Sequence, residues 1–418
     1  DAKFALRSAL HALPTGDAED DVVARAHLLL ALLSFDELPE DVWQYGPDAR
    51  LETYLVHKSK QRMVTAAQVA QALFKATTPD AQYGLLLMLG TYNRHELLQS
   101  WHPKLTEWCL HEYKANPDSG VHSAIHWLYT RWDMMGALHP LDEHLVNAGY
   151  SDGRDWYHDA LNHIMVVVRG PRESVQFSQP LMRQYTSEPL ARTVRLEHTF
   201  AISACEITYR DTASVGFEIE RPQELAPSDD CPISTVSFYQ AAQLCQLLSA
   251  LESLPLAFEL DDAVAADRKF MFGVRGDIDS AGYRLPTDEE WECVVRGDTT
   301  TLRFFGGPET PYLNWYAWYD RDAASTTPVG HHMPNRLGLF DVYGNVFEWT
   351  MTTERRGTEP PQPFIDENTL MLLRGSSWPQ ESVDIHSSIR VGTVAGAARP
   401  DVGMRVCRTL NVETFNSD

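Results

Sequence analysis

The chain has 418 residues, 44% of them hydrophobic, and a formal net charge of −23 from 35 basic and 58 acidic side chains. This length allows two or three domains with real cores, and the acidic excess argues against nucleic-acid binding because it repels phosphate backbones. We also expect no membrane-spanning segment, because no apolar run approaches the length of about 18 residues that a bilayer requires. The six cysteines lack C-x-x-C spacing, which favours reduced thiols and a cytoplasmic location.

Residues 1–150 are predicted to form a series of short helices. Apolar, helix-forming stretches occupy residues 22–34, 64–76, 81–90, 103–114 and 121–132. In the last stretch the apolar positions recur at helical spacing along one stripe, and Asp118 or Ser119 is placed to cap its start. Successive helices of this length favour a short solenoid of paired helices.

Two histidines in this region have the spacing of zinc ligands. His122 and His126 lie four residues apart, as in the H-E-x-x-H motif of zinc proteases, but Ser123 occupies the position of the catalytic glutamate. No further ligand is evident nearby. We therefore expect both histidines to be structural.

The character of the sequence changes near residue 155. The stretch 163–169 is short and rich in β-branched side chains, which predicts a strand. Glycine, proline and aromatic residues become frequent after it. Thr287 and Glu290 have the spacing of a helix-capping box. The dipeptide Gly344–Asn345 predicts a turn, and the alternation of Phe347 and Trp349 around Glu348 points the carboxylate away from two aromatic rings.

Several segments of this second part resemble, in order, the motifs of the formylglycine-generating-enzyme / sulfatase-modifying-factor family. They read HIMVVVRGP at 163–171, FAISACEITYRD at 200–211, CPISTVSFYQAAQLCQLL at 231–248, YRLPTDEEWECVVRG at 283–297, PNRLGLFDVYGNVFEWT at 334–350, LLRGSSW at 372–378 and VGMRVCR at 402–408. The resemblance implies an α+β chain in which an all-α, HEAT-like region (1–150) precedes a loop-rich C-type-lectin-like domain (160–412).

The junction between the two parts carries a weaker resemblance. DSGVHSAIHWLYTRW followed by DWYHDALNHIMVVV is similar to the junction in large bacterial proteins that join HEAT-like repeats to this domain. Such proteins often carry a kinase or another signalling domain further upstream. The resemblance therefore implies a role in a bacterial signalling or defence system.

The chain departs from the enzyme at its reactive centre. The enzyme carries two cysteines just after its R-G-G-S-Y element, and these bind copper(I) as thiolates. Here the residues after Trp378 read PQESVDIHSSIR, and Cys407 is a single thiol in the closing motif. We therefore expect neither copper nor iron and no turnover. The alternative is a metal-dependent oxidoreductase of the formylglycine-generating or ergothioneine type, with an atypical ligand set of Asp384 and His386 together with His163 or a histidine of the helical region.

The predicted function is a non-catalytic binding or regulatory protein that docks a protein partner, with its oligomeric state left open. Aromatic rings beside polar side chains are typical of recognition surfaces. The predicted partner face consists of Trp315, Tyr316, Trp318, Tyr319, Trp378, Gln380, Glu381, Asp384, His386 and Ser388.

Two further expectations concern the aromatic motifs. The resemblance implies a structural calcium ion held by Asp341, Gly344, Val346 and Glu348, and hard oxygen ligands at a turn suit this ion. The alternative is a metal-free loop in which Glu348 pairs with an arginine such as Arg374. The rings expected to share one buried cluster are Trp291, Phe347, Trp349 and Trp378.

Overall fold

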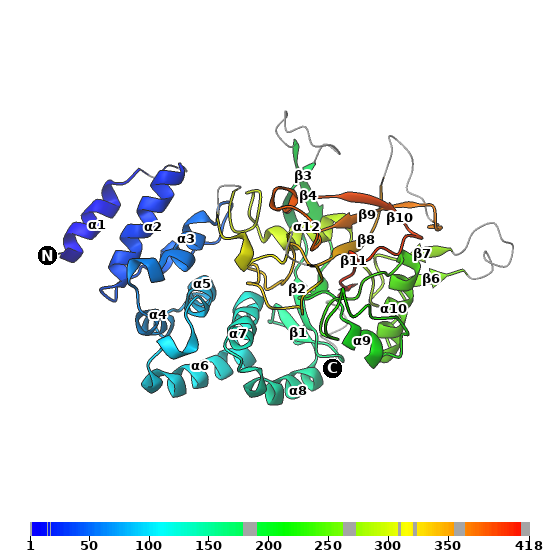
Figure 1. Ribbon diagram of the computed structural model, residues 1–418, viewed down its shortest axis with the longest axis horizontal. Coiled ribbons are helices and arrows are strands. Elements are labelled where there is room, and N and C mark those ends of the chain that lie inside the picture. The colour runs from blue at the N-terminus through cyan, green and yellow to red at the C-terminus, as the bar shows by residue number, and fades with distance from the viewer. Residues whose placement is uncertain are drawn as a thin grey trace. The chain divides into compact units, whose positions relative to one another are not determined.

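The computed structural model describes residues 2–14, 16, 18–178, 190–261, 273–307, 311–320, 324–354 and 364–410. The chain divides into two compact units, helical and sheet-rich (Figure 1). The first unit comprises Asp1–His144, Gly297–Tyr312 and Met333–Gly338, and the second comprises Leu145–Arg296, Leu313–His332 and Leu339–Asp418. The compact units differ from the predicted contiguous ranges, 1–150 and 160–412, in that two later segments group with the helices.

The first unit contains the five predicted helices as α2 Glu19–Leu33, α4 Ala66–Leu73, α5 Pro79–Gly90, α6 His102–Ala115 and α7 Ser119–Arg131. It also contains α1 Ala2–Ala12 and α3 Arg50–Lys58, which lie outside the predicted stretches, and α8 His139–Ala148 leads into the second unit. Local sequence sets several starts: Thr65 and Gln68 form a capping box at α4, and Thr78 caps α5 ahead of a proline. The Asp118 side chain accepts a bond from the α7 backbone, as predicted.

Glycines let tryptophans lie directly on α5. A Cβ atom on Gly84 would come within 2.2 Å of the Trp43 ring, and one on Gly90 within 2.1 Å of Trp127. Both rings are buried. Helix α5 is therefore the central element of the unit, and it also packs against α3, α4 and α7.

The segment Met333–Gly338 is tied to the helices by hydrogen bonds and ion pairs. The Arg336 guanidinium donates to Asp80 at 2.6 Å and to both oxygens of Asp118 at 2.9 Å, so it neutralises acidic groups at the starts of α5 and α7. The Tyr83 hydroxyl donates to the Pro334 carbonyl at 2.7 Å. These contacts make the distant segment part of the helical unit.

His122 has the structural role expected of it. Its side chain is fully buried, its Nδ1 atom lies 2.8 Å from the Tyr113 carbonyl, and its ring stacks on Tyr113. His126 lies half-buried on the same helix.

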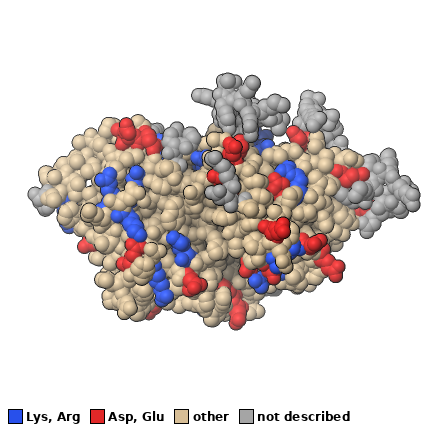
Figure 2. Space-filling model, in the orientation of Figure 1, with Lys and Arg blue, Asp and Glu red and all other residues tan. Residues whose placement is uncertain are grey.

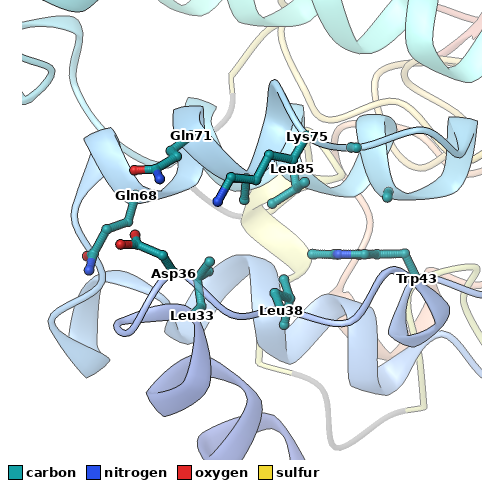
Figure 3. A pocket seen from close by; sticks show the side chains of 11 residues that line it. Leu33, Asp36, Leu38, Trp43, Gln68, Gln71, Lys75 and Leu85 are labelled. Carbon is teal, nitrogen blue, oxygen red and sulfur yellow. The ribbon is translucent and has the colours of Figure 1, made fainter. Parts of the chain in front are cut away.

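A small hollow opens in the helical unit between α2, α4 and α5 (Figure 3). Its lining residues are Leu33, Asp36, Leu38, Trp43, Gln68, Gln71, Ala72, Lys75, Ala76, Ala81 and Leu85.

The second unit is built on two four-stranded sheets and two ribbons. One sheet has the order β1-β2-β5-β12 and is antiparallel; the other has the order β10-β9-β8-β11 and includes one parallel pair, β11 with β8. The strands are β1 Trp156–His158, β2 Ile164–Val168, β3 Arg172–Ser178, β4 Leu190–Leu196, β5 Phe200–Ser203, β6 Phe258–Leu260, β7 Val274–Gly276, β8 Phe347–Thr353, β9 Leu370–Arg374, β10 Val391–Val394, β11 Val402–Gly403 and β12 Cys407–Thr409. The ribbons pair β3 with β4 and β6 with β7. The predicted strand at 163–169 is confirmed as β2.

The described residues of this unit also form the helices α9 Tyr209–Ser214, α10 Phe238–Leu251 and α12 Asp288–Arg296. The capping box predicted from Thr287 and Glu290 is present at the start of α12, with reciprocal bonds of 2.8 and 3.1 Å. The protein is thus α+β, with a helical region followed by a sheet-rich, loop-rich domain.

The main core of the second unit contains two of the four predicted rings. Phe347 and Trp349 belong to it, and Trp291 is fully buried outside it, where it donates a hydrogen bond to Glu348. Trp378 is only half-buried, so its predicted place in the buried cluster is wrong.

Charge is dispersed on the surface. Lysine and arginine side chains are interspersed with aspartate and glutamate on the face in Figure 2, so the acidic excess does not gather in one patch there. None of the helices in the described ranges has the length and apolar character needed to cross a bilayer.

Candidate functional site

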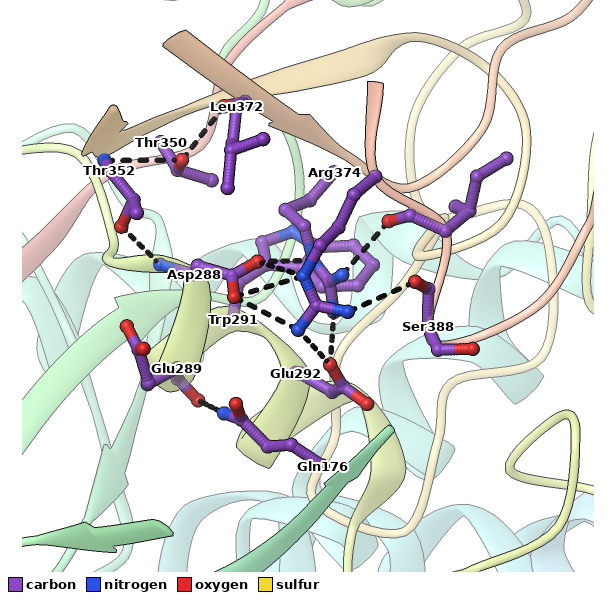
Figure 4. Close-up of polar contacts among 12 residues, drawn as sticks. Gln176, Asp288, Glu289, Trp291, Glu292, Thr350, Thr352, Leu372, Arg374 and Ser388 are labelled. Carbon is purple, nitrogen blue, oxygen red and sulfur yellow. Dashed lines mark hydrogen bonds and ion pairs between the residues drawn. The ribbon is translucent and has the colours of Figure 1, made fainter. Parts of the chain in front are cut away.

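The segment after β9 is held at both ends by ion pairs with α12 (Figure 4). Arg374, the last residue of β9, donates to Glu292 at 2.8 Å and lies 3.3 Å from Asp288. At the other end, Arg390 donates to both oxygens of Asp288 at 3.0 Å and to Glu292 at 2.7 Å. Burial alone raises the pKa values of these two carboxyls, but the guanidiniums outweigh it and hold both below their usual range. Two cations and two anions therefore fix where the segment leaves and rejoins the fold.

Between these anchors the chain turns outward. Val383, in the short turn Ser382–Asp384, has 61% of its surface exposed, and Glu381 beside it is also exposed. Gln380 and Asp384 are half-buried. The structure thus presents an apolar side chain between two carboxylates. Sequence reasoning missed Val383, because a lone valine in an irregular segment resembles a core residue.

His386 and Ser388 do not belong to this surface. They are buried, with 3% and 4% exposed, and the Ser388 hydroxyl lies 3.2 Å from His386 Nδ1. The chain has turned inward here, because Arg374 draws the carbonyls of Ser387 and Ile389 toward the buried ion pairs. The prediction that these two residues contact a partner is therefore wrong.

The aromatic stretch 315–319 lies beside Trp378, as the predicted face requires. Asn345 joins them: its N–H donates to the Trp318 carbonyl and its carbonyl accepts from the Trp378 N–H, both at 2.9 Å. The Asp320 N–H donates to the Trp378 carbonyl at 3.0 Å. Close approach depends on Gly344, which has φ +85° and leaves no room for a Cβ next to the Trp318 carbonyl.

Three of the four rings in the stretch are partly accessible. Trp315, Trp318 and Tyr319 are half-buried, whereas Tyr316 is buried with 3% exposed and cannot contact a partner. Trp318 donates its indole N–H to the Ser325 carbonyl at 2.8 Å, which fixes the orientation of the ring.

The two acidic residues of the predicted calcium loop already have partners. Asp341 accepts from the Gly330 N–H at 2.6 Å and lies 3.2 Å from His332 Nδ1. Glu348 pairs with Arg405 through both oxygens, at 2.6 and 2.7 Å. The expected alternative partner, Arg374, instead serves the α12 carboxylates.

A third buried carboxyl group lies beside this loop. Glu206 has 1% of its surface exposed and accepts bonds from Asn345 and from the Val346 N–H. Burial, and then the nearby carboxylates of Asp341 and Glu348, raise the pKa of Glu206 well above its usual range. Carboxylate oxygens are the donor type that calcium prefers, but Glu206, Asp341 and Glu348 do not form a metal-binding group of three within the described residues. Calcium at Asp341, Gly344, Val346 and Glu348 stays a prediction.

The cysteines of the domain do not form a reactive pair. Cys407 is buried in β12, where its backbone pairs with Arg284, and Cys245 is buried in α10. Burial raises the pKa values of the thiols of Cys205, Cys245 and Cys407. The thiolate is the form of cysteine that binds metals and reacts, and a raised pKa favours the protonated thiol instead.

The alternative oxidoreductase site, Asp384 with His386 and His163, is not assembled. His163 lies between two carboxylates, 2.8 Å from Asp159 and 3.1 Å from Asp211, and they raise its pKa well above the usual range although burial lowers it. Within the described ranges, no three His, Cys, Asp or Glu side chains form a group that could hold a metal. The described residues therefore do not bring Asp384, His386 and His163 together as a metal site, and the oxidoreductase alternative stays a prediction.

Comparison with known proteins agrees with the motifs. The chaperone protein LppX of Paenibacillus barcinonensis is 28% identical to this chain, over a region that covers 43% of this chain and 71% of the length of LppX. The formylglycine-generating enzyme of Mycobacterium tuberculosis is 43% identical over 17% of this chain and 28% of its own. The inactive C-alpha-formylglycine-generating enzyme 2 of Mus musculus is 30% identical over 30% of this chain and 42% of its own.

This chain thus spans less than half of either formylglycine-generating-enzyme relative. Residues 157–410, more than half of the chain, match the model of the sulfatase-modifying factor enzyme 1-like domain. With the motifs, the sheet-rich fold and this match in agreement, the chain belongs to the sulfatase-modifying factor enzyme 1-like family.

Proposed function

We propose that this chain is a non-catalytic protein-binding module. Its docking face consists of Trp315, Trp318, Tyr319, Trp378, Gln380, Glu381, Val383 and Asp384. One observation carries the proposal: the segment that holds the cysteine pair in the enzyme has no thiol here, is clamped by Arg374 and Arg390, and exposes Val383. A rigid loop that displays an apolar side chain needs little ordering on binding, which favours recognition.

The state of the remaining thiols supports the absence of turnover. Copper(I) needs soft thiolate ligands, and the pKa values of Cys205, Cys245 and Cys407 are raised by burial. The mouse relative is named inactive, so the family already includes a member without this activity.

Charge points to the class of partner. Glu381 and Asp384 flank Val383 on the docking face, and the whole chain carries a net charge of −23. A partner with a basic surface around an apolar pocket would be steered toward this face, and faster at low salt. We also propose a cytoplasmic setting, because the six cysteines are free. A role in a bacterial signalling system is supported by the junction motif, which resembles the junction in bacterial signalling proteins.

The test compares two exposed apolar residues of the same unit. Val383→Asp places a charge on the docking face, and Leu256→Asp, at a residue 55% exposed outside the face, is the matched control. Crosslinking in the native host, read by quantitative mass spectrometry, should lose the same partners with Val383→Asp and keep them with Leu256→Asp. Equal partner sets for both variants would contradict the proposed face.

A second measurement addresses catalysis directly. The purified chain should contain no stoichiometric copper or iron, and it should not consume oxygen in the presence of a cysteine-containing peptide. Stoichiometric metal together with turnover would overturn the proposal and restore the oxidoreductase alternative.

A further inference from the structure

The hollow of the helical unit has a polar end and an apolar end. Leu38, Trp43 and Leu85 gather at one end, and Asp36, Gln68, Gln71 and the Lys75 ammonium at the other (Figure 3). Leu33 lies between them. An amphipathic molecule is the ligand that such a division fits.

The polar end contains charges of both signs without partners in the described part of the chain. Asp36 and Lys75 are exposed, and neither side chain forms an ion pair or a hydrogen bond with a described residue. The Gln71 side chain likewise forms no hydrogen bond with a described residue. The Gln68 side chain, in contrast, caps α4 and donates to the Ser34 carbonyl at 2.7 Å. One anion, one cation and one amide therefore face the hollow from opposite walls.

The size of the hollow limits what it can hold. Its cavity volume is ≈ 50 Å³, which excludes nucleotides and other large cofactors. Such a volume has room for roughly four waters or one short aliphatic side chain.

We propose that this hollow binds a free aliphatic α-amino acid such as leucine. The side chain lies against Leu38, Trp43 and Leu85, and the carboxylate pairs with Lys75 while the ammonium pairs with Asp36. An aliphatic residue inside a peptide has neither charge, so it would use only the apolar end. This site lies in the helical unit and is independent of the docking face.

The probes separate the three parts of the ligand. Leucine should raise the melting temperature of the whole chain and give a saturable calorimetric titration. 4-Methylpentanoate lacks the ammonium and 3-methylbutylamine lacks the carboxylate, so each should bind at least about tenfold more weakly. If N-acetyl-leucinamide binds as well as leucine, the occupant is a peptide residue and the proposal is wrong.

Two pairs of variants locate the site. Ala72→Leu fills the hollow and should abolish leucine binding, whereas Ala67→Leu, at a half-buried residue of α4 outside the lining, should not. Asp36→Asn removes the charge at a residue with φ +62°, a conformation that asparagine tolerates, and should weaken binding about tenfold or more. Asp133→Asn, at φ +54° away from the hollow, is its control.

The melting temperature of each variant without ligand verifies folding. Absence of a leucine response in the wild-type chain would overturn the proposal, as would unchanged binding by Asp36→Asn and Ala72→Leu.

Discussion

Glu52 is a carboxylic acid buried in α3, with 4% of its surface exposed. Its Oε2 atom has no hydrogen-bond partner among the described residues. Burial raises the pKa of Glu52 to about 8. Between the ordinary pKa of a glutamate and this raised value, the Glu52 carboxyl therefore stays protonated in the folded protein, whereas it is ionised in the unfolded chain. Stability that depends on this proton is fully present in acid, and is lost as the pH rises from about 4.5 to about 8.

This residue yields a pH-dependent prediction. Glu52→Gln has no proton to lose, so its stability relative to the wild type should increase from pH 5 to pH 8.5, by on the order of a few kcal/mol. Urea unfolding at the two pH values measures the difference. Glu107→Gln, at an exposed glutamate of α6, is the control. A difference between wild type and Glu52→Gln that does not change with pH would show that Glu52 is ionised in the fold.

At the scale of elements, close packing overrides helix propensity in α5. An alanine in a helix interior is normally more favourable than glycine by about 1 kcal/mol. At position 84, however, the added Cβ would lie 2.2 Å from the Trp43 ring. Gly84→Ala should therefore destabilise the protein, by about 1–3 kcal/mol.

Thermal unfolding checks the sign of this change. Gly136→Ala serves as the control, because a Cβ there would meet nothing within 4 Å. A stabilised Gly84→Ala variant would mean that Trp43 moves away from α5 at little cost.

The loop between Asp341 and Glu348 carries the calcium prediction. If it binds calcium, a chelator should lower the melting temperature, and added calcium should restore it while magnesium does not. Asp341→Asn should abolish the response, and asparagine tolerates the positive φ of 51° at this position. A melting temperature insensitive to the chelator would instead leave Arg405 as the group that balances the Glu348 charge.

At the scale of the whole molecule, the helical unit depends on segments far along the sequence. A fragment of residues 1–150 lacks Arg336, and would leave Asp80 and Asp118 without the guanidinium that they share. It would also lack the Pro334 carbonyl that accepts from the buried Tyr83 hydroxyl. We expect this fragment to unfold at a lower temperature than the helices do in the full chain.

Arg336→Met in the full chain isolates the charge from the rest of the segment. The ion pairs of Arg336 with Asp80 and Asp118 are part-buried, so the loss of stability should be smaller than the about 3–5 kcal/mol that breaking a fully buried pair costs. Hydrogen exchange of the α5 and α7 amides should therefore accelerate. Unchanged protection in this variant, and a fragment as stable as the full chain, would show that the helices fold on their own.

Local patterns in the sequence were sufficient for the family, the order of the two structural regions, several helices of the first region and the starts of α7 and α12. Asp118 at α7 and the Thr287–Glu290 box at α12 act within four residues, so their effect does not depend on the rest of the fold. The motifs from 163 to 408 likewise identified the family without knowledge of any contact. The missing cysteines after Trp378 are also a property of the sequence alone.

The tertiary structure decided which polar residues are buried and which segments meet. His386 and Ser388 follow the exposed Val383 within a few residues, yet they are buried because Arg374 and Arg390 pull the chain onto the carboxylates of α12. Nothing in the local pattern reveals a pairing between residues so far apart. The same reason explains why Arg336 joins the helical unit: burial of a charge depends on partners that only the folded chain brings together.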